Sequence, residues 1–220
     1  PAFTPSDQTT TVTASATGFP SAQRTVTARQ SVVRLSSQSP QALGLDLQDR
    51  FTLRLEPSAQ SSTNVTLSVA VGAPCRLARD EATIGSTSIS LTLPAGRSSR
   101  GFIVQAIGPV GLTCDITASA GGVYPPTTSL RPIPVACAGV RLESVPNYLY
   151  QTSAPDPFRV RSGVPADGDG DLLHVQTVRP GVSGAAIGVK ACIEASSSPI
   201  VIPGADGSGC KVASISVGSS

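Results

Sequence analysis

The chain repeats short sequence patterns at a spacing near 107 residues, and this spacing limits what it can fold into more than any other feature. Val33-Arg34-Leu35 returns as Val140-Arg141-Leu142 at an offset of 107. Phe51-Thr52-Leu53-Arg54 returns as Phe158-Arg159-Val160-Arg161 at the same offset of 107. Because both matches keep one register across the loop between them, we expect two copies of one module in tandem.

Two further matches show where the copies differ in loop length. Leu91-Thr92-Leu93-Pro94 matches Ile200-Val201-Ile202-Pro203 at an offset of 109, and Val12-Thr13-Ala14-Ser15-Ala16 matches Ile116-Thr117-Ala118-Ser119-Ala120 at 104. The phase of these matches divides the chain into three parts. We expect residues 1–30 to hold the closing strands of a preceding or neighbouring module, residues 31–136 a complete module, and residues 137–220 a second module without its last strands.

Composition favours an all-β fold. Aromatic residues make up 4% of the chain, Trp and Met are absent, and there are 21 Gly and 19 Pro. Short runs that alternate Ser or Thr with Val, Ile or Leu are typical of strands with one buried face. Their density predicts tandem antiparallel β-sandwiches. In the segment 130–137, a linker or first strand of the next module, Pro132 and Pro134 are expected to exclude a central strand.

Three segments carry a resemblance to a known family. They are Asn64-Val65-Thr66-Leu67-Ser68-Val69, the run from Leu91-Thr92-Leu93-Pro94-Ala95-Gly96 to Val104, and Asp115-Ile116-Thr117-Ala118-Ser119-Ala120-Gly121. This pattern resembles the bacterial immunoglobulin-like repeats of large extracellular surface proteins. The resemblance implies an immunoglobulin-like sandwich in a stalk or adhesin array, with no catalytic residues.

The five cysteines favour disulfides, and so an oxidising compartment, because their spacing matches no metal site. Cys75 and Cys114 fall in the complete module, and Cys192 and Cys210 in the second. We predict these two pairings, although the five residues also allow others. Cys137 is left over at the boundary, where it either bridges two molecules or is a buried free thiol.

Two short constellations are candidate ligand sites. Asp167, Asp169 and Asp171 alternate with glycine and offer oxygen ligands to Ca²⁺, or else form a solvated Asp-Gly turn. Tyr148 and Tyr150 share one face of a strand, either as a stacking platform for a sugar or as core residues. We expect no other cofactor.

Several classes of function are disfavoured by the sequence. His174 is the single histidine and no nucleophile motif accompanies it, so we expect a packed or surface histidine and no enzyme. The net charge is +2 and the basic residues are scattered, which argues against nucleic acid. No apolar run is long enough for a membrane span.

The sequence therefore predicts a structural, extracellular cell-surface protein. Its partners are expected to be adjacent copies of the same module or subunit, assembled head to tail into an array or filament by strand complementation. The alternative is an adhesin module that binds a glycan or protein receptor through loops at one end of the sandwich.

Overall fold

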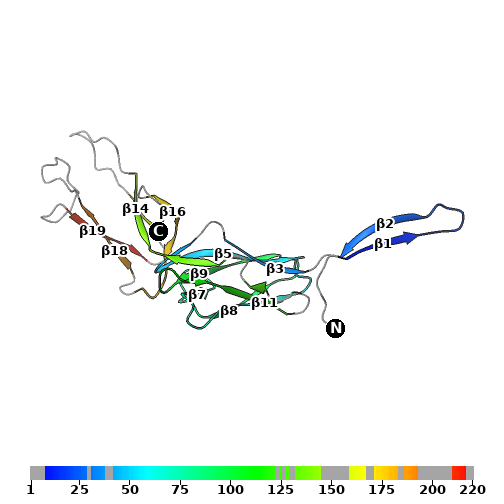
Figure 1. Ribbon diagram of the computed structural model, residues 1–220, viewed down its shortest axis with the longest axis horizontal. Coiled ribbons are helices and arrows are strands. Elements are labelled where there is room, and N and C mark those ends of the chain that lie inside the picture. Colours follow the sequence, from blue (N-terminus) through cyan, green and yellow to red (C-terminus); the bar gives the residue numbers. More distant parts are fainter. Residues whose placement is uncertain are drawn as a thin grey trace.

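The computed structural model describes residues 8–28, 31–37, 42–121, 124, 127–128, 132–144, 159–166, 171–182, 186–192 and 210–216. All regular secondary structure within these residues is β-strand, and nearly all strand pairs are antiparallel. The predicted all-β class is confirmed. The chain is extended, with a sandwich in the middle and strands projecting at both ends (Figure 1).

Three sheets build the central sandwich. One has the order β17-β5-β9-β7, with β3 also paired to β5; its strands are β3 (Val32–Ser37), β5 (Leu47–Glu56), β7 (Cys75–Ala78), β9 (Ser99–Ala106) and β17 (Thr177–Val178). The second, β12-β11-β6-β8, contains β6 (Thr63–Val69), β8 (Ser88–Leu93), β11 (Ile116–Ala120) and β12 (Thr127–Thr128). A small third sheet joins β10 (Thr113–Cys114), β13 (Ile133–Ala136) and β4 (Leu43–Gly44).

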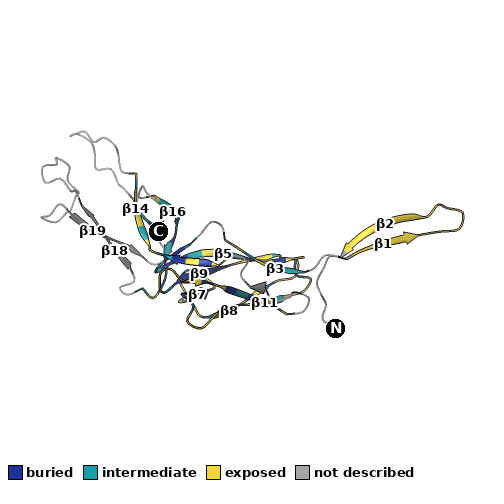
Figure 2. Cartoon of the chain, in the orientation of Figure 1, coloured by how far each residue is buried: buried dark blue, intermediate teal, exposed yellow. Residues whose placement is uncertain are grey.

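The sandwich closes over one apolar core. Alternate residues of β6 face inwards, so that Val65 and Leu67 are buried while Thr66 between them is exposed. The core draws its buried members from both large sheets and from residues between 33 and 135, including Phe51, Leu93, Phe102 and Ile116. Figure 2 shows this burial concentrated in the centre of the molecule.

The same strand register occurs twice. In the β3–β5 ladder Arg34 lies opposite Arg54. In the ladder between β14 (Gly139–Glu143) and β15 (Arg159–Pro165), Arg141 lies opposite Arg161. Each partner in the second ladder is 107 residues beyond its counterpart in the first. The sequence offset is thus also an offset in strand pairing.

The second half departs from the first after this shared ladder. In the sandwich, the strand that follows β5 along the chain, β6, lies in the other sheet, whereas β16 (Leu172–Val175) pairs directly with β15. The described residues of the second half form this three-stranded sheet and the separate hairpin of β18 (Ala186–Cys192) and β19 (Cys210–Ser216). The partner of β17, by contrast, is β5 of the sandwich.

The expectation that proline excludes a central strand near residue 134 was wrong. β13 lies between β10 and β4, with Pro134 opposite Thr113. The backbone N–H of Val135 donates to Leu112 O at 2.8 Å, so by alternation the nitrogen of Pro134 faces the β4 side. On that side β13 pairs with β4 only through Val135 and Ala136. Proline is tolerated at residue 134 because no backbone N–H is needed there for a hydrogen bond to β4.

An N-terminal hairpin projects beyond the sandwich (Figure 1). It consists of β1 (Gln8–Ala14) and β2 (Ala22–Ala28), and Gly18 adopts a left-handed φ of 84° in the turn. The hairpin extends away from the end of the sandwich that is opposite to β14 and β16 (Figure 1).

Candidate functional site: the junction of the two halves

The second half is fastened to the sandwich through the free edge of β5. β3 pairs with residues 51–56 of β5, and β17 continues along the same edge, with Val178 opposite Leu47. Leu47 and Val178 are fully buried and form a small core of their own, against which Val160 and Val182 pack. We call this contact region, which centres on residues 42–49 and 174–179, the junction.

Gln176 ties the second half to the backbone of the first. Its side-chain Nε2 donates to Ala42 O at 2.9 Å, and its Oε1 accepts from the backbone N–H of Gly44 at 2.8 Å. Its own backbone is held by Ser162, whose Oγ donates to Gln176 O at 2.7 Å. Since Gln176 and Ser162 are each 1% exposed, these bonds satisfy polar groups that water does not reach.

A second buried amide network extends the junction into the sandwich. Gln48 Nε2 donates to Glu81 O at 2.9 Å and to Val178 O at 3.3 Å. Gln105 Nε2 donates to Gln48 Oε1 at 2.9 Å, and Gln105 Oε1 accepts from Gly85 N at 2.8 Å. The network thereby connects β17, β5, β9 and the segment after β7 into one unit.

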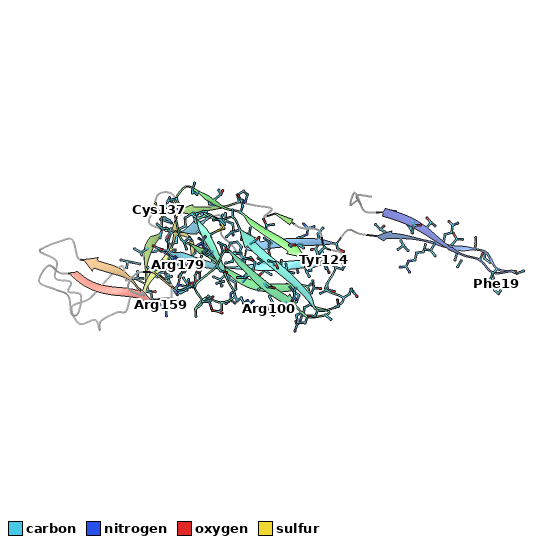
Figure 3. The ribbon with its side chains drawn as sticks, turned by 90° about the horizontal axis from the view of Figure 1, so that it is seen from below. Phe19, Arg100, Tyr124, Cys137, Arg159 and Arg179 are labelled. Carbon is cyan, nitrogen blue, oxygen red and sulfur yellow. A yellow bond between two sulfur atoms is a disulfide. The ribbon has the colours of Figure 1, made fainter. Side chains whose placement is uncertain are left out.

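Arg179 closes the edge of the junction. Its backbone N–H donates to Asp46 O at 3.1 Å, its Nη2 pairs with Asp46 Oδ1, and its Nε donates to Ala106 O at 2.9 Å. Asp46 has a φ of 64°, in the left-handed region that aspartate tolerates better than most residues. A turn at residues 45–46 separates β4 from β5. Figure 3 shows Arg179 at the end of the sandwich opposite to Tyr124.

His174 and Asp49 form a second ion pair across the junction, beside that of Arg179 and Asp46. His174 Nε2 lies 2.9 Å from Asp49 Oδ2, and the two side chains are 28% and 13% exposed. Burial raises the pKa of the Asp49 carboxyl, while the backbone N–H of Arg50 and the nearby His174 act to lower it. The histidine is a packed strand residue, as the sequence favoured.

An ion cluster lies on the β14–β15–β16 sheet beside the junction. Glu143 pairs with Arg141 and, at 3.3 Å, with Arg161 Nε, and Arg141 Nη1 is 3.3 Å from Asp171 Oδ1. The hydrogen bond from Arg141 is the main cause that lowers the pKa of Glu143, and the same bond raises the pKa of Arg141. The cluster places charge on one face of β14 and β15, whereas Val140 and Leu142 lie on the opposite face of β14.

The predicted disulfide of the sandwich is confirmed. Cys75 of β7 and Cys114 of β10 are bonded, with Cα atoms 5.8 Å apart. Cys192 and Cys210 are register partners in the β18–β19 ladder, and their pairing stays a prediction. Cys137 is a free thiol and exposed, so the interpretation of a buried thiol was wrong. It follows directly after β13, where the chain leaves the sandwich.

The other predicted site residues are not brought together in the described structure. Asp167, Asp169, Tyr148 and Tyr150 lie outside the described residues. Asp171 is described, is exposed and contacts Arg141. Within the parts of the chain that the structure describes, no group of three or more metal-ligating side chains occurs.

The arrangement at the junction is suited to holding two parts of the chain in a fixed relation. Its polar side chains bind backbone groups across the contact, and its carboxylates are engaged by arginine or histidine. Sequence reasoning missed its key residues, which are Asp46, Gln48, Asp49, Gln176 and Arg179. Their one available signal was a set of amides and acids within otherwise apolar strands, which is weak because such residues are usually on the surface.

Comparison with known proteins adds no family assignment: no family model matches the chain, and no curated protein matches it. The residues that the structure describes contain no helix that is long and apolar enough to cross a membrane.

Proposed function

We propose that this chain is a structural, extracellular protein that consists of immunoglobulin-like β-sandwich modules in tandem, as part of a cell-surface array or filament. The observation that carries the proposal is the recurrence of one strand register, Arg34 opposite Arg54 and Arg141 opposite Arg161, together with a buried junction between the two ladders. Repeated units that are locked to their neighbours are what an extended scaffold requires.

One feature favours the extracellular side, and a second favours a stiff scaffold. The Cys75–Cys114 disulfide suits an oxidising compartment. The junction buries two apolar residues and several hydrogen bonds, so it opposes bending between the halves, whereas ordinary inter-domain contacts allow relative motion. A stiff joint transmits force and keeps a distal part of an array away from the cell.

The test is labelling of intact cells of the source organism with an antibody raised against residues 31–182. Labelling without permeabilisation, lost after brief treatment of whole cells with protease, is the expected result. Labelling that requires permeabilisation would overturn the proposal. A control tests whether the compartment is oxidising. Thiol alkylation and mass spectrometry of protein taken directly from cells measure the redox state of Cys75 and Cys114, which should be disulfide-bonded.

A second candidate function, a glycan-binding adhesin module, is favoured by one observation. A groove of about 490 Å³ runs beside β7 and β8 and is lined by polar residues that include Arg79, Asp80 and Ser88 and by apolar residues that include Ile84 and Ile89. This volume suits a small ligand, and hydroxyl and charged groups suit a sugar. Binding on a glycan array that the exposed-site variant Ser88→Arg abolishes would support this candidate.

A further inference from the structure

The N-terminal hairpin has two chemically different faces. Register partners in β1–β2 share a face, and one set of pairs is entirely polar: Thr9 with Thr27, Thr11 with Thr25, and Thr13 with Gln23. The other set is mostly apolar and comprises Thr10 with Val26, Val12 with Arg24, and Ala14 with Ala22. This is the pattern of a half-buried sheet.

Nothing in the described structure covers the apolar face of the hairpin. Val12 is 56% exposed and Val26 is 47% exposed, and every residue from 9 to 27 is exposed (Figure 2). An isolated two-stranded hairpin is marginally stable in water. The apolar face therefore needs a partner.

The first sandwich contains a strand of closely similar sequence with its partner in place. Val12 and Ala14 of β1 match Ile116 and Ala118 of β11 at the offset of 104. Ile116 is 1% exposed and Ala118 is 0% exposed. The side chains that the hairpin leaves in water are thus of the kind that the sandwich places in its core.

β14 shows the complementary situation. Val140 and Leu142 match Val33 and Leu35 of β3 at the offset of 107. Val33 is 1% exposed and Leu35 packs against the core, whereas Val140 is 49% exposed and Leu142 is 51% exposed. The opposite face of β14 carries the ion cluster of Arg141 and Glu143 and is not available for apolar packing.

We infer that the apolar face of the β1–β2 hairpin of one molecule packs on the Val140 and Leu142 face of β14 in a second copy of this chain. In the first sandwich, Val33 of β3 and Ile116 of β11 belong to one core. β14 and β1 are the counterparts of these two strands, and each leaves the corresponding apolar side chains exposed. The inference rests on the proposed function, since it takes the two halves as copies of one module.

The positions of the two surfaces determine the form of the assembly. The hairpin and β14 lie at opposite ends of the molecule (Figure 1). A contact between different surfaces at opposite ends is heterologous, so it joins molecules head to tail and does not close a two-fold dimer.

The size of the hairpin face predicts a weak contact. Strands of seven residues are about 24 Å long and the pair is roughly 10 Å wide, so about 500 Å² is buried in total. Stable interfaces bury at least about 1,000–1,200 Å². Association is therefore expected to depend steeply on concentration and to be promoted where many copies lie on one surface.

The test is sedimentation equilibrium of the full chain from micromolar to millimolar concentration, in the Cys137→Ser background so that the exposed thiol forms no covalent dimers. The weight-average mass is expected to rise with concentration. Val12→Lys and Leu142→Lys each abolish this rise. Thr11→Lys, on the polar face of the same strand, and Val71→Lys, at an exposed valine in a loop of the sandwich, leave it unchanged.

Mixing identifies the two surfaces as partners. Val12→Lys keeps an intact acceptor face and Leu142→Lys keeps an intact hairpin, so an equimolar mixture gives a one-to-one dimer that neither variant forms alone. Association of Leu142→Lys with itself would show hairpin-to-hairpin contact and overturn the inference. A parent chain that remains monomeric at every concentration would also overturn it, while labelling of intact cells tests the proposed function independently. Unchanged thermal melting of each variant shows that the fold is retained.

Discussion

The side-chain oxygen of Gln176 accepts a hydrogen bond from the backbone N–H of Gly44 at 2.8 Å, although 132 residues separate them in the chain. The same side chain donates to Ala42 O. One glutamine thus replaces two strand-pairing bonds at the point where the second half meets the sandwich. The junction depends on it more than on the exposed ion pairs nearby, because exposed pairs contribute little to stability.

Gln176→Ala is expected to lower the free energy of unfolding by about 2–4 kcal/mol, since it leaves the buried N–H of Gly44 and the partly buried carbonyl of Ala42 without partners. Urea denaturation measures the loss. Hydrogen exchange gives a local readout, because the Gly44 amide should lose protection. The matched control is Gln60→Ala, whose side chain is exposed and makes one bond of 3.4 Å, with an expected change below about 0.5 kcal/mol. Equal effects of the two variants would contradict the role of Gln176.

The close approach of β15 and β16 depends on Gly163. A Cβ atom at this position would lie 2.1 Å from the backbone oxygen of His174, so the two strands would have to separate. Gly163→Ala is expected to cost about 1–3 kcal/mol of unfolding free energy, as overpacking does. Gly108→Ala is the control, because nothing lies within 4 Å of the added atom there. Loss of stability in both variants would point to a general effect of replacing glycine.

Much of the fold follows from local sequence, and the reasons are visible in particular elements. β6 and β8 alternate apolar and polar residues, and their burial alternates with them, as expected of strands with one buried face. Cys75 and Cys114 pair because they fall in one sandwich. The pairing of β17 with β5 had no local signal, since a two-residue strand has no periodicity and its partner is about 130 residues away. The rule against proline failed at Pro134 because it treats every backbone N–H of a central strand as needed.

The candidate site was harder to predict than the fold for a physical reason. Gln48, Gln105 and Gln176 are each 1% exposed, although glutamine is usually a surface residue. Their burial is tolerated because each finds backbone or amide partners from segments far away in the sequence. A sequence shows the residue type but not these partners.

Removal of the Cys75–Cys114 disulfide tests how far the sandwich depends on it. The bond closes a loop with a sequence separation of 39, and the loop-entropy relation gives about 4 kcal/mol for a closure of this length. The double variant Cys75→Ser and Cys114→Ser should lose most of that amount, measured by urea denaturation. Cys137→Ser, at the exposed free thiol, should leave stability unchanged. A double variant as stable as the parent would show that packing alone determines the stability of the sandwich.

The Asp49 carboxyl is expected to make the junction less stable as the pH rises. Burial raises the pKa of this carboxyl above its usual value, against the opposing effects of the Arg50 backbone N–H and His174. A group whose pKa is higher in the folded protein holds its proton more tightly there. Its contribution to stability is fully present below the usual carboxyl pKa and is lost as the pH rises through the raised value.

Asp49→Asn removes this titration, because asparagine stays neutral. The unfolding free energy of the parent relative to Asp49→Asn should therefore fall as the pH rises from about 4, and become constant above the raised pKa. Asp80 provides a control of opposite sign, because the hydrogen bond from Thr83 lowers its pKa. The unfolding free energy of the parent relative to Asp80→Asn should therefore rise with pH. Urea denaturation at a series of pH values measures both differences. If the Asp49 difference grew with pH, the folded carboxyl would favour its charged form, and the His174 pair would outweigh burial in the junction.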